Sequence, residues 1–437
     1  HVLQTNPSLH IQRQNLLSQV EEVEQAYAFL LPSLNAEGAV NGFSLDSDPG
    51  SETDGIEKTM GLTLSQFLYR GGQTDHGIIE QLNLLKAAEF EYLQDVQDVF
   101  STVIASAARV EFARNSLSLA VNNADRLRRQ FQSAQAGFEV GELTRTDVAQ
   151  ARARLSEAES DIIRAQGDVY QAEAEYSEVT NRQPPNRFTM TDVAGFIPEN
   201  RDELVDIALG GNAEIIAQLY RVEAARRGVS AQKGVLYPQL ELQGELSQTY
   251  DPRSGLDEQG GGVIGVRASL PIFNRGINRS EIRRSQTDLY AQKARLDQLR
   301  FAIRSDAVSV WQNYKTAKSE LTARRSQINA AEIALEGVGA ERENGTRTVL
   351  DVLDANQELL NARNAYNAAK RDVTIACYEL LALMGVLGPD AFSLEDETFN
   401  HPQLVGDSFG KSFGQLANPL LKVRNAALEA LGMTQIE

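Results

Sequence analysis

The chain has 437 residues, of which 42% are hydrophobic, and it carries a formal net charge of −18. This acidic balance argues against general nucleic-acid binding, because that function needs basic surface to neutralise phosphates. Cys377 is the one cysteine, so no intrachain disulfide can form, and it is most simply a small side chain in a helix core. No run approaches the about 18 apolar residues that a transmembrane helix requires.

The first part of the chain predicts a helix followed by two strands. A helical pattern covers about 8–31 and ends before Pro32, which cannot continue a helix. Apolar and polar residues then alternate on both sides of a polar stretch at 46–56. We therefore expect a β-hairpin over 33–70, with strands of roughly ten residues joined by a loop at 46–56.

A very long helical hairpin is predicted next, over 72–183. Apolar residues recur there at spacings of three and four, as in a coiled coil, and the pattern is interrupted at Gly141. At ~1.5 Å per residue its first arm would reach roughly 90–100 Å. No globular core needs a helix of that length.

The same order of elements then repeats. Alternating strands are expected at 238–272 around a loop at 251–262, and a second long hairpin at 276–385 turns at Gly345. The tip sequences Gly141-Glu-Leu-Thr-Arg-Thr-Asp147 and Gly345-Thr-Arg-Thr-Val-Leu-Asp351 lie 204 residues apart, as do the apolar positions of the two returning arms. The chain is therefore an internal duplication of strand, loop, strand and hairpin.

The remaining segments, 1–31, 184–236 and 386–437, are predicted to form a mixed α/β region with connecting helices. One helix is expected over about 201–236 and a short one near 416–431.

The four strands allow more than one fold. They could form an ordinary half-buried sheet, but their length also suits outer-membrane strands. Four strands cannot close a barrel, and an open sheet edge is not tolerated in lipid. Two copies of the chain would contribute eight strands to one barrel, and three copies would contribute twelve. The number of strands per chain does not decide between two and three copies. A free-standing antiparallel coiled coil would explain the helices but not the two duplicated β-hairpins.

The second tip carries a specific resemblance. Gly345-Thr-Arg-Thr followed by Leu350-Asp-Val-Leu-Asp-Ala355, together with the duplication and Tyr237-Pro238 before the third strand, resembles the TolC family of outer-membrane efflux proteins. The resemblance extends from Leu31 to about Gly385. It implies a homotrimer in which twelve pooled strands form an outer-membrane β-barrel, continuous with a periplasmic α-helical barrel that has a mixed α/β belt.

The resemblance also implies a function. The chain is expected in the outer membrane of a Gram-negative bacterium, in contact with its lipid and extending into the periplasm. There the trimer would be an exit duct for proteins or small molecules such as drugs and toxins, gated by iris-like opening of the helical tips. Its partners would be a periplasmic adaptor and an inner-membrane transporter of the ABC, RND or MFS type, with no nucleic acid and no cofactor.

The resemblance assigns gate residues at the tips. Arg347 matches a latch arginine, Asp147 its acidic partner on the other hairpin, with Thr146 alongside. Asp351 and Asp354 match the acidic residues of the constriction. Independently, residues three apart share a helix face, so threefold symmetry would stack two carboxylate rings, which favour cations. The alternative, Asp351 as a helix-start residue favoured by the dipole, does not account for Asp354.

One departure concerns the gate. Relatives have a tyrosine just before the tip glycine, whereas Ala340-Glu-Arg-Glu-Asn344 has none, so part of the lock is replaced or missing. An enzyme is not expected, since the four histidines show no zinc-binding spacing and Gly260-Gly-Gly262 precedes no helix. The competing hypothesis is a soluble coiled-coil scaffold with β-hairpins as assembly elements.

Overall fold

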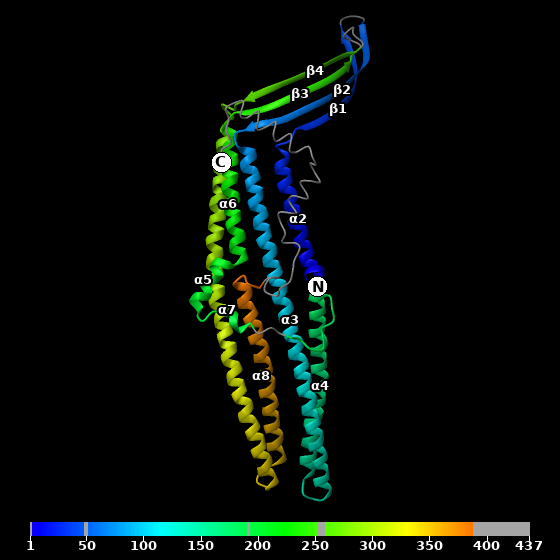
Figure 1. The fold of residues 1–437 in the computed structure, drawn as a ribbon. Coiled ribbons are helices and arrows are strands. Elements are labelled where there is room, and N and C mark those ends of the chain that lie inside the picture. The colour runs from blue at the N-terminus through cyan, green and yellow to red at the C-terminus, as the bar shows by residue number, and fades with distance from the viewer. Residues whose placement is uncertain (1, 48–50, 190–192, 252–257, 388–437) are drawn as a thin grey trace. The chain divides into compact units, whose positions relative to one another are not determined.

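A computed structural model describes residues 2–47, 51–189, 193–251 and 258–387 (Figure 1). Its α-helices are α1 (Val2–Thr5), α2 (Pro7–Ala28), α3 (Gln73–Glu139), α4 (Arg145–Thr180), α5 (Arg201–Gly211), α6 (Ala213–Lys233), α7 (Ile277–Glu343) and α8 (Val349–Leu383). Its strands are β1 (Ser33–Ser47), β2 (Ser51–Arg70), β3 (Gln239–Tyr250) and β4 (Gln259–Ser269), and two short 3-10 helices are η1 (Ala194–Phe196) and η2 (Gly234–Leu236).

The chain forms two compact units. Of the described residues, the first takes in 2–13, 91–215 and 298–387, and the second takes in 14–90 and 216–297. The sheet belongs to the second unit, and both hairpin tips belong to the first.

The sheet joins the two predicted β-hairpins. All neighbours are antiparallel and the order is β1-β2-β3-β4 (Figure 1). The central pairing, β2 with β3, places Leu62 opposite Leu246 and so connects the two halves of the duplication. Among the residues that the structure describes, β1 and β4 each pair on one side only.

The strands are longer than predicted. β1 has 15 residues and β2 has 20, and they pair as far as Ser47 opposite Ser51, so most of the loop expected at 46–56 is strand. In the second hairpin β4 begins at Gln259, inside the loop expected at 251–262. The prediction failed because it equated polar sequence with loop. Backbone pairing in a ladder does not depend on apolar side chains.

One face of the sheet is apolar and open. Even-numbered residues of β1, β3, β4 and of β2 as far as Gln66 share this face, because the registers join Leu34 to Leu64, Leu62 to Leu246, and Gly244 to Ile264. Several of their apolar side chains are largely exposed, with Leu34 at 67%, Met60 at 72% and Ile264 at 73%. The opposite face carries residues such as Glu37, Thr63, Glu245 and Arg267.

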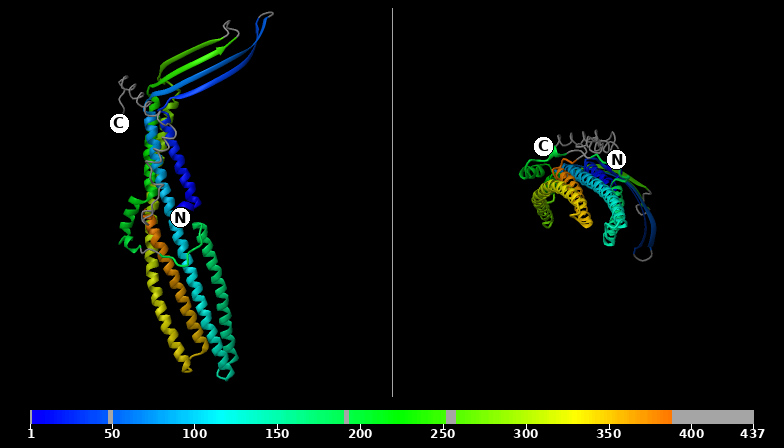
Figure 2. Two further views of the ribbon diagram at one scale, coloured as in Figure 1. Left: turned by 45° about the vertical axis from the view of Figure 1, so that its right-hand side comes forward. Right: turned by 90° about the horizontal axis from the view of Figure 1, so that it is seen from below.

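The two helical hairpins are of matching size. α3 and α7 have 67 residues each, and α4 and α8 have 36 and 35, which confirms the internal duplication. Viewed from below, their lower parts form a curved row (Figure 2). Small residues allow close packing: Val110 and Ala113 meet Val169 and Ala172 in one hairpin, and in the other the cluster contains Ala331, Leu359 and Ala362.

The helix predicted over about 201–236 is interrupted at Asn212. Asn212 leaves the helical conformation, with φ −64° and ψ 126°, and its buried side chain begins the next helix by accepting from the backbone N–H groups of Glu214 and Ile215. Its amide nitrogen donates to the carbonyl of Leu383 at 3.3 Å. This anchor is not visible in helical periodicity, so the prediction of one continuous helix was wrong. The short helix expected near 416–431 lies outside the described residues.

Candidate functional site at the helical tips

Each helical hairpin turns at the glycine singled out by its sequence. Gly141 has φ +81° and Gly345 φ +76°, a left-handed conformation that favours glycine. The turns are matched in their hydrogen bonds: Glu142 N donates to Gly137 O at 2.9 Å, and Thr346 N donates to Glu341 O at 3.0 Å. Both are helix-terminating motifs of the kind that ends with a left-handed residue.

A threonine and an aspartate begin the returning helix at each tip. Asp147 accepts hydrogen bonds from the backbone N–H and the hydroxyl of Thr144, at 2.9 and 2.7 Å, and its own N–H donates to the Thr144 hydroxyl. Thr348 and Asp351 repeat this arrangement. These are reciprocal capping boxes. Hydrogen bonds from Thr144 lower the pKa of Asp147, and those from Thr348 lower the pKa of Asp351.

Within the chain, the predicted latch residues contact other partners. Arg347 Nε lies 2.8 Å from Glu341 Oε2, at the end of α7 in the same hairpin, and Asp147 is engaged by Thr144. Thr146 is exposed. The structure of one chain therefore does not bring Arg347 and Asp147 together. Sequence reasoning missed Glu341 and the threonine caps, although the Thr-x-x-Asp spacing of a cap was readable at both tips.

The two predicted constriction aspartates have different surroundings. Asp351 has the helix-start role that was the alternative at the sequence level. Asp354 lies one turn further along α8, where its Oδ1 is 2.9 Å from Nη2 of Arg154 on α4. Arg154 also contacts Glu157 at 3.1 Å. Its pairing with Asp354 was not predicted, because it connects two hairpins that lie 200 residues apart in sequence.

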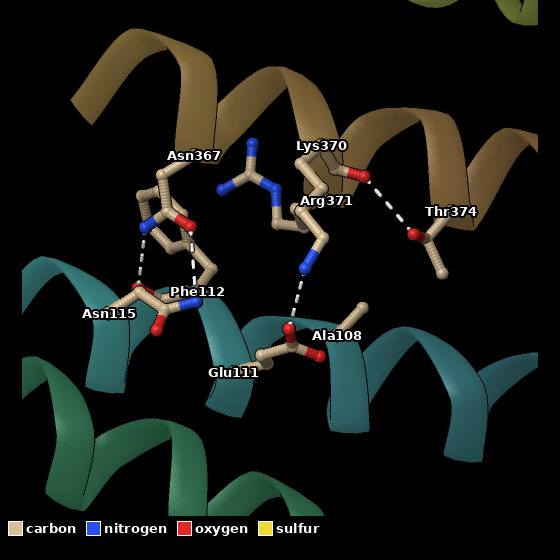
Figure 3. Close-up of a pocket in the computed structure, with 8 residues that line it drawn as sticks. All are labelled: Ala108, Glu111, Phe112, Asn115, Asn367, Lys370, Arg371 and Thr374. Carbon is tan, nitrogen blue, oxygen red and sulfur yellow. Dashed lines mark hydrogen bonds and ion pairs between the residues drawn. The ribbon is translucent and has the colours of Figure 1, made fainter. Parts of the chain in front are cut away.

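Behind the tips, polar contacts fix α8 against α3. Asn356 Nδ2 donates to Asn123 Oδ1 at 2.7 Å, and both side chains are buried. Further along, Asn367 donates to the carbonyl of Phe112, and Lys370 Nζ lies 2.8 Å from Glu111 (Figure 3). The guanidinium of Arg371 lies 4.6 Å from the centre of the Phe112 ring. We call these contacts the α3–α8 seam.

The described residues contain neither a candidate metal site nor a helix that could cross a membrane. In that part of the chain, no group of three or more histidine, cysteine, aspartate or glutamate side chains could hold a metal ion. None of the described helices has the length and hydropathy needed to cross a membrane.

The model of the outer membrane efflux protein family matches residues 1–182 and 204–386, so the chain belongs to this family. It is therefore an outer-membrane efflux channel protein that extends into the periplasm, and its relatives are channels rather than enzymes.

Individual relatives agree with this assignment. The chain is 33% identical over 339 residues to the outer membrane efflux protein BepC of Brucella suis, covering 77% of this chain and 74% of BepC. It is 24% identical to the outer membrane protein TolC of Vibrio cholerae, covering 84% of this chain and 85% of TolC. The solved CmeC outer membrane channel of Campylobacter jejuni has the same fold, with a TM-score of 0.76 at 17% identity over 92% of this chain and 87% of CmeC.

Proposed function

We propose that three copies of this chain form an outer-membrane duct that is closed at the helical tips. The observation that carries the proposal is the open apolar face of the sheet, on which side chains such as Met60 and Ile264 are largely exposed. A face of this kind suits lipid, and β3 and β4, with 12 and 11 residues, are long enough to span its hydrocarbon.

The sheet edges support pooling of strands between chains. In the described part of the chain β1 and β4 each have one unpaired edge, and unpaired backbone groups are costly in lipid. Three sheets joined edge to edge would give a closed barrel of twelve strands. Two sheets would give eight, and the family resemblance favours three.

Membership of the family also supports a transport route. In this proposal a periplasmic adaptor and an inner-membrane transporter of the ABC, RND or MFS type deliver proteins or small molecules to the duct. The chain supplies the passage and the gate, and the transporter supplies the energy. Arg347, Asp147 and Thr146 would form the latch between neighbouring chains, and Asp351 and Asp354 would line the constriction.

A combined measurement of assembly and conductance tests the duct. The chain is extracted from outer membranes with detergent, its mass is determined by light scattering, and the same sample is added to planar bilayers. A trimer with discrete single-channel currents is expected. A chain that is monodisperse without detergent and carries no current would refute the duct and favour the soluble scaffold.

A further inference from the structure

The tip of α8 is docked on the first hairpin within a single chain. Val349 and Leu353 are 3% and 2% exposed, and they belong to one cluster with Ala124, Leu127 and Ala158. These partners come from α3 and α4. The second tip therefore has an apolar attachment to the first hairpin that does not require a neighbouring chain.

An ion pair lies at the same place on α8. Asp354, the residue after Leu353, is 2.9 Å from Arg154, which is four residues before Ala158 on α4. The side chains of Arg154 and Asp354 are 34% and 56% exposed. An exposed pair of this kind contributes little to overall stability and exchanges readily with water.

The polar contacts that hold α8 on the first hairpin differ before and after Asn356. From Asn356 onward the α3–α8 seam includes the buried amides of Asn356 and Asn367, and Asn356 makes the 2.7 Å contact to Asn123. Separating buried amide partners leaves each without a hydrogen bond, which is costly. Before Asn356, the polar contact that the described residues of α8 make with the first hairpin is the exposed Arg154–Asp354 pair. The first turns of α8 are thus held on the first hairpin by the apolar cluster of Val349 and Leu353 and by this exposed pair.

We propose that Arg154 is a gating residue that holds the tip of α8 on the first hairpin and neutralises Asp354 while it does so. This inference rests on the proposed duct and adds a residue to its gate. When the tip undocks, Asp354 loses its counter-charge. The constriction then becomes more strongly anionic as it opens, so cation selectivity increases together with conductance.

Single-channel recording of Arg154→Ser tests both halves of the inference. Loss of an exposed pair is expected to raise open-state occupancy about two- to fivefold, and the permeability ratio of K⁺ to Cl⁻ is expected to rise. Arg154→Lys, which keeps the charge, should stay close to wild type. The double variant Arg154→Asp with Asp354→Arg should restore the low occupancy while lowering cation selectivity.

Two matched controls lie on the same helix. Arg152→Ser removes an exposed arginine two residues away, and Arg164→Ser removes one whose ion pair, to Asp161, lies within α4. The inference would be overturned if Arg154→Ser matched these controls in open-state occupancy and selectivity. It would also be overturned if the double variant Arg154→Asp with Asp354→Arg had an occupancy as high as that of Arg154→Ser.

The single-channel current of the wild-type protein distinguishes failure of this inference from failure of the proposed duct. Absence of wild-type current would refute the duct itself. Normal wild-type current with an inert Arg154→Ser would refute only the role of Arg154. Trimer mass and helical circular dichroism, measured on every variant, identify any variant that has failed to fold.

Discussion

Asp147 and Asp351 lie 204 residues apart and make the same hydrogen bonds. Each carboxylate accepts from the N–H and the hydroxyl of the threonine three residues before it, at distances between 2.7 and 2.9 Å. Both residues are also candidates for the gate. The capping role and the gating role must therefore be separated by experiment.

Removing one cap should loosen one tip. Thr144→Ala deletes the hydroxyl that Asp147 uses and is expected to cost about 1 kcal/mol locally. Amide exchange in the first turn of α4 should then be about fivefold faster. Ser156→Ala, an exposed position within α4, is the control and should leave this exchange unchanged. Since the pKa of Asp147 is lowered, the cap is complete above about pH 4, and its protection is lost as pH falls through the lowered value.

The latch prediction concerns Arg347. Arg347→Ser and Asp147→Ala should each raise single-channel conductance in planar bilayers, because each removes one side of the proposed contact between chains. Thr144→Ala removes the cap without the carboxylate and should have the smaller effect. Unchanged conductance in both latch variants would contradict the assignment.

A variant of Glu341 distinguishes a role of Arg347 between chains from a role within its own hairpin. If Arg347 acts on a neighbouring chain, Glu341→Gln should leave conductance near the wild-type value, because it removes only the contact at 2.8 Å within one hairpin. A Glu341→Gln channel that conducts like Arg347→Ser would instead place the function of Arg347 inside its own hairpin.

The ring prediction concerns selectivity. Replacing both Asp351 and Asp354 by alanine should weaken the preference for cations, since rings of carboxylates attract cations and repel anions. The permeability ratio of K⁺ to Cl⁻, taken from reversal potentials in a salt gradient, measures this. A ratio equal to that of wild type would place the charged constriction elsewhere.

A pH effect on stability is expected at Asp95 in α3. Burial, together with the negative charges of Asp98 and Glu91, raises the pKa of Asp95 to about 6. The folded state then binds more protons than the unfolded state between about pH 4 and pH 6, so stability falls as pH rises through this window. Asp95→Asn should raise the thermal midpoint above pH 6, with the gain vanishing towards pH 4. Asp168→Asn removes the same charge at an exposed site and should not reproduce this dependence.

The buried amide pair of the α3–α8 seam should be sensitive to substitution. Asn356→Leu leaves the buried Asn123 amide without its partner and removes the acceptor of Arg126 Nε, and is expected to cost about 1–3 kcal/mol. The thermal midpoint of the trimer in detergent should fall. Asn361→Ala, at an exposed position of the same helix, is the control. Equal midpoints for the two variants would show that the pair contributes little.

Most of the architecture could be predicted because it follows periodicity. The spacing of three and four, the glycines at 141 and 345 and the 204-residue repeat are local or repeated patterns, and the structure contains two hairpins of matching length. The break at Asn212 could not be predicted in this way, since its reason is a contact with Leu383 far along the chain.

The site was predicted less completely for the same physical reason. The tips and their aspartates were found from residue type and spacing, whereas the contacts of Asp354 with Arg154 and of Asn356 with Asn123 join the two hairpins. Nothing in either segment alone identifies its partner. Contacts between neighbouring chains are harder still to predict from the sequence of one chain. The latch therefore stays a prediction.

The open apolar face of the sheet has a consequence for biogenesis. Before the strands reach lipid, side chains such as Leu34 and Met60 would face water beside unpaired strand edges, a combination that promotes aggregation. We expect that newly exported chains must be shielded at this sheet by a chaperone until they insert. The rate of insertion, more than the stability of the helices, would then limit the yield of the protein.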